Sequence, residues 1–233
     1  MEPIRKHFSE QLEEQRERVL YMGGLVEAAV HGSLKALHER DPAVAEEVVQ
    51  ALEPEINRLE VELDERVLRL LALQQPMAVD LRFLAAVLKI GNDLERMGDL
   101  AVNIAQGVPR LLALPLAPST VDLPLMAERA NRMLRSALDA LLKREVGLAR
   151  AVLEADDEVD RMRDAIFREL LASMSREPQQ VERGLALLFV ARNLERIADH
   201  ATNIAEDVIF WIAGVDVRHH FREQPSPAPA SRS

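Results

Sequence analysis

The feature that most constrains the fold is a stretch of sequence that occurs twice. LERMGDLAVNIA spans residues 94–105, and LERIADHATNIA spans residues 194–205. When residues 88–105 are aligned with residues 188–205, half of the positions are identical. The segments before them also correspond, at an offset of 103: Glu53, Ile56, Asn57 and Leu59 match Asp156, Val159, Asp160 and Met162. The repeat predicts two halves of equivalent structure.

Hydrophobic periodicity and proline positions predict three long helices in each half. We expect helices over 9–39, 42–73 and 77–107, and then over 124–145, 147–173 and 178–213. Asp41 followed by Pro42 is typical of a helix start. Aromatic residues make up only 3% of the chain, and an aliphatic core suits helix packing better than a sheet. The predicted fold class is all-α, with two tandem three-helix bundles related by the internal repeat.

Proline also marks the predicted domain boundaries. Residues 1–107 form the first bundle in this interpretation, and residues 123–214 form the second. The linker between them, 108–122, contains Pro109, Pro115 and Pro118, a density that no continuous helix tolerates. Residues 222–233 are rich in Pro and Ser and are expected to form a disordered tail.

One apolar stripe in each half is predicted to form a bundle core. Its steps alternate between three and four residues, which places it on one helix face. In the first half it comprises Val87, Ile90, Leu94, Met97, Ala101, Ile104, Val108 and Leu111, and equivalent positions recur 100 residues later.

A polar stripe accompanies each apolar one, and it is the main candidate for chemistry. Steps of four residues align Glu95, Asp99 and Asn103 in the first half and Glu195, Asp199 and Asn203 in the second. We expect these stripes on the surface, roughly opposite the apolar face. Pairs at i, i+4 spacing on the preceding helices, Glu53 with Asn57 and Asp156 with Asp160, add further oxygen donors. Carboxylate and amide oxygens suit hard metal cations.

Composition narrows the classes of partner. The 233 residues carry a formal net charge of −10 and no run of Lys and Arg, so neither nucleic acid nor an anionic membrane is an expected partner. The chain has no cysteine, which excludes disulfides and thiolate metal sites. The N-terminal segment lacks a signal peptide's apolar stretch, and no apolar run approaches ~18 residues. We predict a cytoplasmic protein without membrane insertion.

Three segments resemble the PhoU family of regulators of bacterial phosphate uptake. They are EINRLEVELDERVLRLLALQQPMAVDLRFL from residue 55, NDLERMGDLAVNIA from residue 92, and NLERIADHATNIAEDVIFWIAG from residue 193. The resemblance implies two three-helix bundles and a cytoplasmic, non-enzymatic negative regulator of phosphate uptake and starvation signalling. It also implies contact with a phosphate-specific ABC transporter and a sensor histidine kinase, and a homodimer is expected.

The resemblance further implies clusters of iron or another divalent cation held by paired E(D)-x-x-x-D motifs. Carried onto this chain, the motifs fall on Glu53, Asn57, Glu95, Asp99, Asp156, Asp160, Glu195 and Asp199, with Asn103 and Asn203 extending the stripes. The first half departs from the pattern, because Asn57 replaces a carboxylate and Leu100 stands where the second half has His200. With four carboxylates against three, the second half is expected to bind metal more tightly.

The residues leave two alternatives open. A metal-free helical scaffold or adaptor would have the same fold and leave the polar stripes merely solvated. A carboxylate-bridged metal enzyme would use inward Glu residues with Glu-x-x-His pairs. The sequence has no Glu-x-x-His, and Glu27 with His31 is an isolated i, i+4 pair.

Overall fold

The computed structural model describes residues 2–114 and 121–218, and no strand occurs in these two ranges. The first half contains α1 (Glu2–Glu39), α2 (Pro42–Glu47), the π-helix η1 (Val48–Leu52), α3 (Glu53–Gln74) and α4 (Ala78–Ala113). The second contains α5 (Leu123–Lys143), α6 (Val146–Arg176), the 3₁₀ turn η2 (Pro178–Gln180) and α7 (Val181–Ala213). The predicted all-α fold with two three-helix halves is confirmed.

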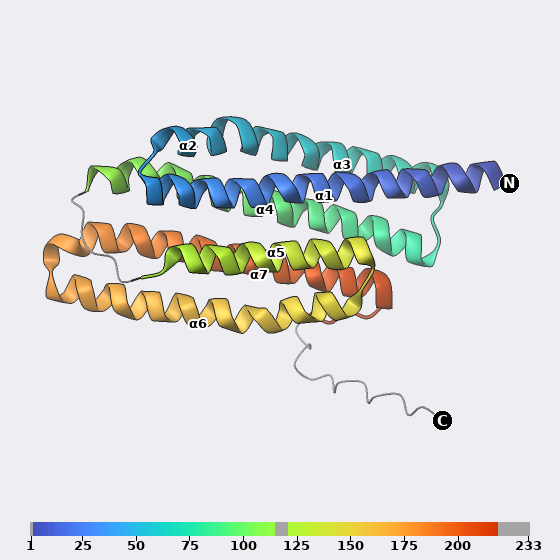
Figure 1. Ribbon diagram of the computed structural model, residues 1–233. Helices are drawn as coiled ribbons and strands as arrows, with labels where there is room; N and C mark the ends of the chain where they lie inside the picture. Colours follow the sequence, from blue (N-terminus) through green and yellow to red (C-terminus); the bar gives the residue numbers. More distant parts are fainter. Residues whose placement is uncertain (1, 115–120, 219–233) are drawn as a thin grey trace, which may run out of the picture.

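The helices lie side by side along one long axis, in an upper half formed by α1–α4 and a lower half formed by α5–α7 (Figure 1). Short connections make consecutive long helices antiparallel neighbours. The halves meet along two lines, because α4 packs on α7 and α1 packs on α5.

Proline residues interrupt fewer helices than the sequence indicated. The helix predicted from Pro42 runs without interruption to Gln74, and η1 ends two residues before Pro54. A π-turn widens the helix where proline lacks its N–H. Asp41 caps this helix as predicted, since its carboxylate accepts a hydrogen bond from the Ala43 N–H at 2.9 Å.

The expected linker begins later than residue 108. Helix α4 continues through Pro109 to Ala113, so the prediction of an interruption at Pro109 was wrong. Val108 and Leu111 are both buried beside this proline, and their packing offsets the lost helical hydrogen bond. Residues 115–120 and the predicted tail at 222–233 lie outside the described residues.

The central helices α4 and α7 hold the largest share of the core. Their predicted apolar stripes are buried, as are further positions such as Leu84 and Ile209. The two helices run antiparallel, so the start of α4 meets the end of α7. There the rings of Phe83 and Trp211 pack in a tilted arrangement with centroids 4.9 Å apart, and Arg82 donates to the Trp211 carbonyl at 3.1 Å. One continuous core therefore spans both halves.

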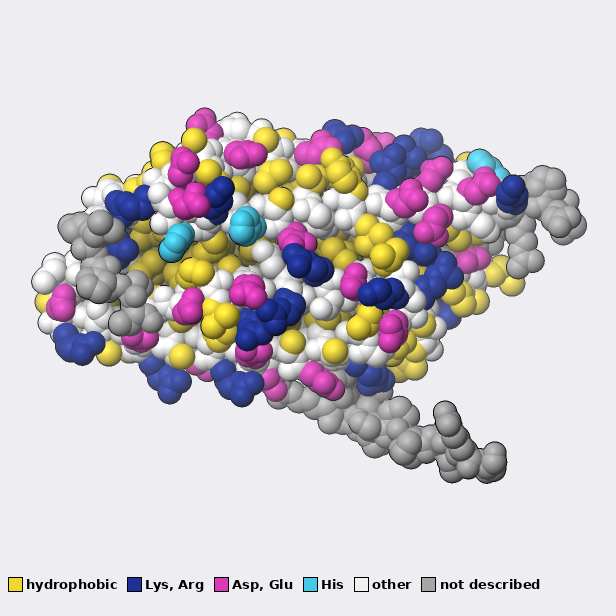
Figure 2. Space-filling view, viewed as in Figure 1, with side chains coloured by type: hydrophobic (Ala, Val, Ile, Leu, Met, Phe, Trp, Pro, Cys, Tyr) yellow, Lys and Arg dark blue, Asp and Glu magenta, His cyan; other side chains and the backbone are white. Residues whose placement is uncertain are grey.

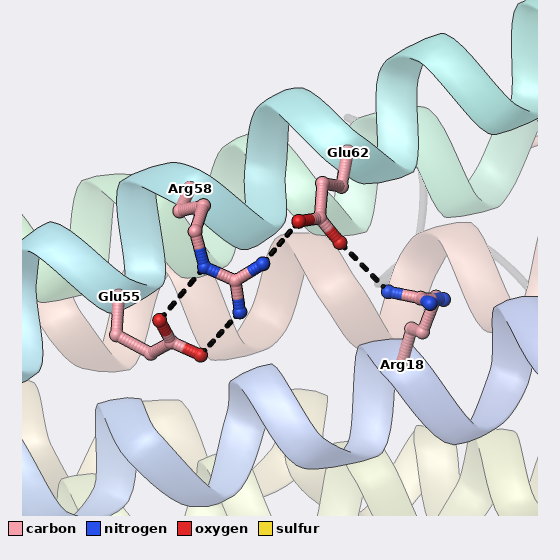
Figure 3. Close-up of polar contacts among 4 residues, drawn as sticks. All are labelled: Arg18, Glu55, Arg58 and Glu62. Carbon is pink, nitrogen blue, oxygen red and sulfur yellow. Dashed lines mark hydrogen bonds and ion pairs between the residues drawn. The ribbon is translucent and has the colours of Figure 1, made fainter.

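An ion-pair network fastens α1 to α3 at the edge of the upper half (Figure 3). Arg58 donates to both Glu55 and Glu62 on its own helix. Arg18 of α1 reaches the other Glu62 oxygen at 2.9 Å. Since these side chains remain partly exposed, the network orients the two helices more than it stabilises them.

The line between α1 and α5 is tight at one end and open at the other. At Gly23, an added Cβ would stand 2.3 Å from a Leu138 methyl, so the missing side chain permits this close approach. Farther along, the two helices diverge around a groove of about 860 Å³ lined on opposite sides by segments 24–39 and 124–135. Figure 2 shows apolar side chains on the floor of the hollow between the two halves.

Substitution of two adjacent glycines tests this packing. Gly24→Ala meets open space and should raise the free energy of unfolding by about 0.5–1 kcal/mol, as expected for glycine replacement in a helix. Gly23→Ala forces Leu138 to move within the core and should lose that gain, leaving the two variants at least about 1 kcal/mol apart. Urea denaturation measures both. Equal stabilisation would contradict the close α1–α5 contact.

Candidate functional site

The predicted acidic residues of the first half gather between α3 and α4. Burial raises the pKa of the Glu95 carboxyl, and the nearby charges of Asp99, Glu60 and Glu53 raise it further, while Arg96 lowers it. Glu95 therefore shares its surroundings with these three carboxylates. Glu60 was not predicted. We call Glu53, Asn57, Glu60, Glu95 and Asp99 the first acidic cluster.

Asn57 contributes an uncommitted oxygen to the first acidic cluster. Its amide nitrogen donates to Glu53 at 2.9 Å. Its amide oxygen is buried and has no hydrogen-bond partner, an arrangement that costs free energy unless a donor or cation satisfies it.

The equivalent residues of the second half gather between α6 and α7. Burial raises the pKa of Asp199 to about 6, and the charges of Glu195, Asp156 and Asp160 contribute, while His200 opposes them. We call Asp156, Asp160, Glu195 and Asp199 the second acidic cluster. Its members come from the two predicted motifs, which the fold brings together as the first half does.

A basic side chain distinguishes the second acidic cluster from the first. Arg163 approaches Asp160 of its own helix at 3.5 Å and Glu195 of α7 at 3.6 Å. Its counterpart at the offset of 103 is Glu60. Both clusters therefore contain four carboxylates, and the second half does not have the larger number that the motifs alone indicated. In the second half, an arginine bridges the two helices.

The prediction that the polar stripes lie opposite the apolar faces of their helices is wrong. The side chains of Glu95 and Glu195 are each only 20% exposed, because α3 and α6 cover that flank of α4 and α7. Asn103 is exposed beyond the carboxylates. Asn203 turns instead toward the first half, where its amide donates to Asp93 at 3.2 Å.

Asp93 is the centre of a polar contact between the halves that the sequence analysis missed. The residue is 7% exposed, and its carboxylate also lies 2.7 Å from the His200 ring nitrogen Nδ1. Nearby, Lys89 pairs with the buried Asp207 at 2.7 Å. A departure from the repeat could have revealed this contact, since His200 corresponds to Leu100 and Asp93 to Asn193. Asp93 and His200 differ from their equivalents at the place where α4 meets α7.

The donor chemistry of both acidic clusters fits a hard cation. Every donor is an oxygen, each cluster draws on two helices, and the first contains the unsatisfied Asn57 oxygen. As the side chains lie, however, no three His, Asp or Glu groups within 2–114 and 121–218 converge closely enough to hold one ion. A bound cation would have to draw the carboxylates together.

Both the sequence and the fold are similar to those of known proteins. A model described as the PhoU domain matches residues 19–108 and again residues 123–208. A phosphate-specific transport system accessory protein PhoU homolog of Pseudomonas putida is 39% identical over 93% of this chain and 84% of its own length. The crystal structure of PhoU from Pseudomonas aeruginosa superposes with a TM-score of 0.86 at 37% identity, covering 89% of this chain and 100% of that chain. PhoU of Streptococcus pneumoniae, titled a phosphate transport system regulatory protein, gives 0.83 at 30% identity, over 90% and 99% of the two chains.

Because carboxylates crowd around Asp199, neutralising this residue is predicted to stabilise the folded protein in a pH-dependent way. Because its folded-state pKa lies above the ordinary 3.8, the folded protein holds the proton more tightly, and stability falls as pH rises from 3.8 to about 6. In chelator-treated protein at about pH 7.5, Asp199→Asn should therefore raise the thermal midpoint. The gain should stay below about 1 kcal/mol, since solvent screens this exposed group.

The control is Glu65→Gln, which removes one exposed carboxylate from α3 and should leave the midpoint unchanged. The gain from Asp199→Asn should shrink as the pH falls toward 5. A lower midpoint for Asp199→Asn at neutral pH would show that the carboxylate is stabilising and contradict the repulsion.

Proposed function

Because this chain belongs to the PhoU family, we propose that it is a negative regulator of phosphate uptake and phosphate-starvation signalling, acting when phosphate is abundant. The observation that carries the proposal is the family match in both halves, over residues 19–108 and 123–208. The fold supports it, since the helices superpose on PhoU crystal structures over most of the chain. A role in phosphate transport is common to the names of the relatives.

The proposed mode of action is contact with other proteins rather than catalysis. The expected partners are a phosphate-specific ABC transporter, with which the relatives' name of accessory protein agrees, and a sensor histidine kinase. The regulator would work in the cytoplasm as a homodimer. In the described part of the chain, no helix combines the length and apolarity needed to cross a membrane.

The two acidic clusters are the proposed metal-binding regions, for iron or another divalent cation. Glu53, Glu60, Glu95 and Asp99 would supply charge in the first, and the Asn57 oxygen would gain the partner it lacks. Asp156, Asp160, Glu195 and Asp199 would serve the second after displacing Arg163. A bound cation would neutralise the repulsion that raises the pKa of Asp199.

Loss of the protein should derepress the phosphate-starvation response. In a strain lacking this chain, a reporter driven by a phosphate-starvation promoter should be active even in phosphate-rich medium. Expression of the wild-type chain from a plasmid should restore repression. Normal repression in the deletion strain would contradict the regulatory function.

Exchange of the two residues that distinguish the acidic clusters tests metal binding. Arg163→Glu gives the second cluster the residue of the first and should raise the metal bound per chain. Glu60→Arg introduces the competing cation into the first cluster and should lower it. Elemental analysis after loading with Fe²⁺ or Mn²⁺ measures both, and circular dichroism checks that the fold is retained.

Arg161→Glu is the matched control, because it makes the same charge change on α6 at an exposed residue outside the cluster. It should leave the metal content unchanged. Absence of metal from the wild-type chain and from Arg163→Glu at every loading would favour the metal-free adaptor, with the acidic clusters as partner-binding surfaces.

A further inference from the structure

A groove between α6 and α7 has apolar walls that no part of the described chain covers. It measures about 680 Å³. Phe167 is 49% exposed, Leu185 57% and Phe189 49%, and Leu188 lies among them. Large apolar side chains that share one concave surface are typical of a protein-binding site.

Two arginines without partners edge this groove. Arg192 and Arg196 lie four residues apart on α7 and line the groove. Both are exposed, and neither forms an ion pair within the two described ranges, although their chain carries a net charge of −10. Unpaired cations beside an apolar surface favour a partner that brings negative charge.

The internal repeat provides a comparison for this surface. The equivalent positions in the first half are Asp64 for Phe167, Ala85 for Leu185, Lys89 for Phe189 and Asn92 for Arg192. The two halves share their buried positions, so the fold does not require these aromatic, aliphatic and basic side chains. These four residues are particular to the second half and need a reason other than folding, whereas Arg196 has an equivalent in Arg96.

We propose that the α6–α7 groove docks an amphipathic helix of a partner protein, with its apolar stripe on Phe167, Leu185 and Phe189 and its acidic flank on Arg192 and Arg196. Parallel walls formed by two helices fit a helix laid between them, with anchors at i, i+3, i+4 and i+7. Half-exposed aromatic residues supply the anchoring contacts. The inference rests on the proposed function only for the partner's identity.

The groove also continues into the second acidic cluster. Arg163, Glu195 and Asp199 are part of its lining. Along α7, Arg192 and Arg196 alternate with Glu195 and Asp199. A docked helix must therefore place its carboxylates on the arginines and away from Glu195 and Asp199, so charge restricts its register.

The first test uses a synthetic peptide of about 20 residues, with Leu at i, i+3, i+4 and i+7 and Glu on both flanks. Fluorescence anisotropy should detect binding to the wild-type chain that weakens with added salt. A peptide with Lys in place of Glu should bind at least about tenfold more weakly. Equal binding of both peptides, or none by either, would overturn the proposal.

Two variants locate the site. The first carries F167D, L185A, F189K and R192N, which are the residues of the first half, and should weaken acidic-peptide binding at least about tenfold. The second, R192E with R196E, alters only exposed charges and should reverse the preference toward the Lys peptide. The control L81K changes a comparably exposed apolar residue on α4 and should bind as wild type. Full binding by the first two variants would overturn the proposal.

The same variants separate this proposal from the regulatory function. The organism's phosphate ABC transporter, purified in detergent, should bind the wild-type chain and lose affinity for both groove variants. Peptide binding without transporter binding would refute that partner and leave the groove intact. Equal transporter binding by all variants would keep the partner and overturn the groove. Light scattering completes the test, because dissociation of a dimer in the groove variants would assign the surface to a second copy of this chain.

Discussion

The structure depends on the burial of α4 against α7. These helices come from different halves, and each already packs on two helices of its own half. Their apolar stripes, with the Phe83–Trp211 contact at one end, merge the two bundles into one core. Apolar burial contributes about 25 cal/mol per Å², so a contact along two helices of more than 30 residues dominates the specific polar links beside it.

The central position of α4 and α7 explains why the acidic residues on them are partly buried. A helix with neighbours on several sides has little free surface, so the polar stripes are pressed against α3 and α6. Partial burial and like charge then raise the pKa of Glu95 and Asp199. The two halves differ in this repulsion, since Arg163 offsets negative charge in the second acidic cluster, whereas Glu60 adds a carboxylate to the first.

The repeat separates what the fold needs from what it does not. Positions that agree between the halves include buried residues such as Leu94 and Ile104, which preserve the bundle, and the polar stripe of Glu95, Asp99 and Asn103. Two of the differences between the halves change the surface chemistry: Asp93 meets His200 at the α4–α7 contact, and Leu185, Phe189 and Arg192 of the outer α6–α7 groove replace Ala85, Lys89 and Asn92. The two halves have thus come to offer different surfaces on one architecture.

The sequence by itself determined the fold class, the helices and the apolar faces, because periodicity and capping act over a few residues. It also identified the motifs of both acidic clusters. Tertiary structure alone decided that Pro109 remains within α4, since distant packing at Val108 and Leu111 outweighs one lost hydrogen bond. It likewise brought Glu60 to the first cluster, Arg163 to the second and Asn203 to Asp93. Such encounters depend on how helices are rotated and paired across the molecule, and the spacing of residues along one helix does not specify that.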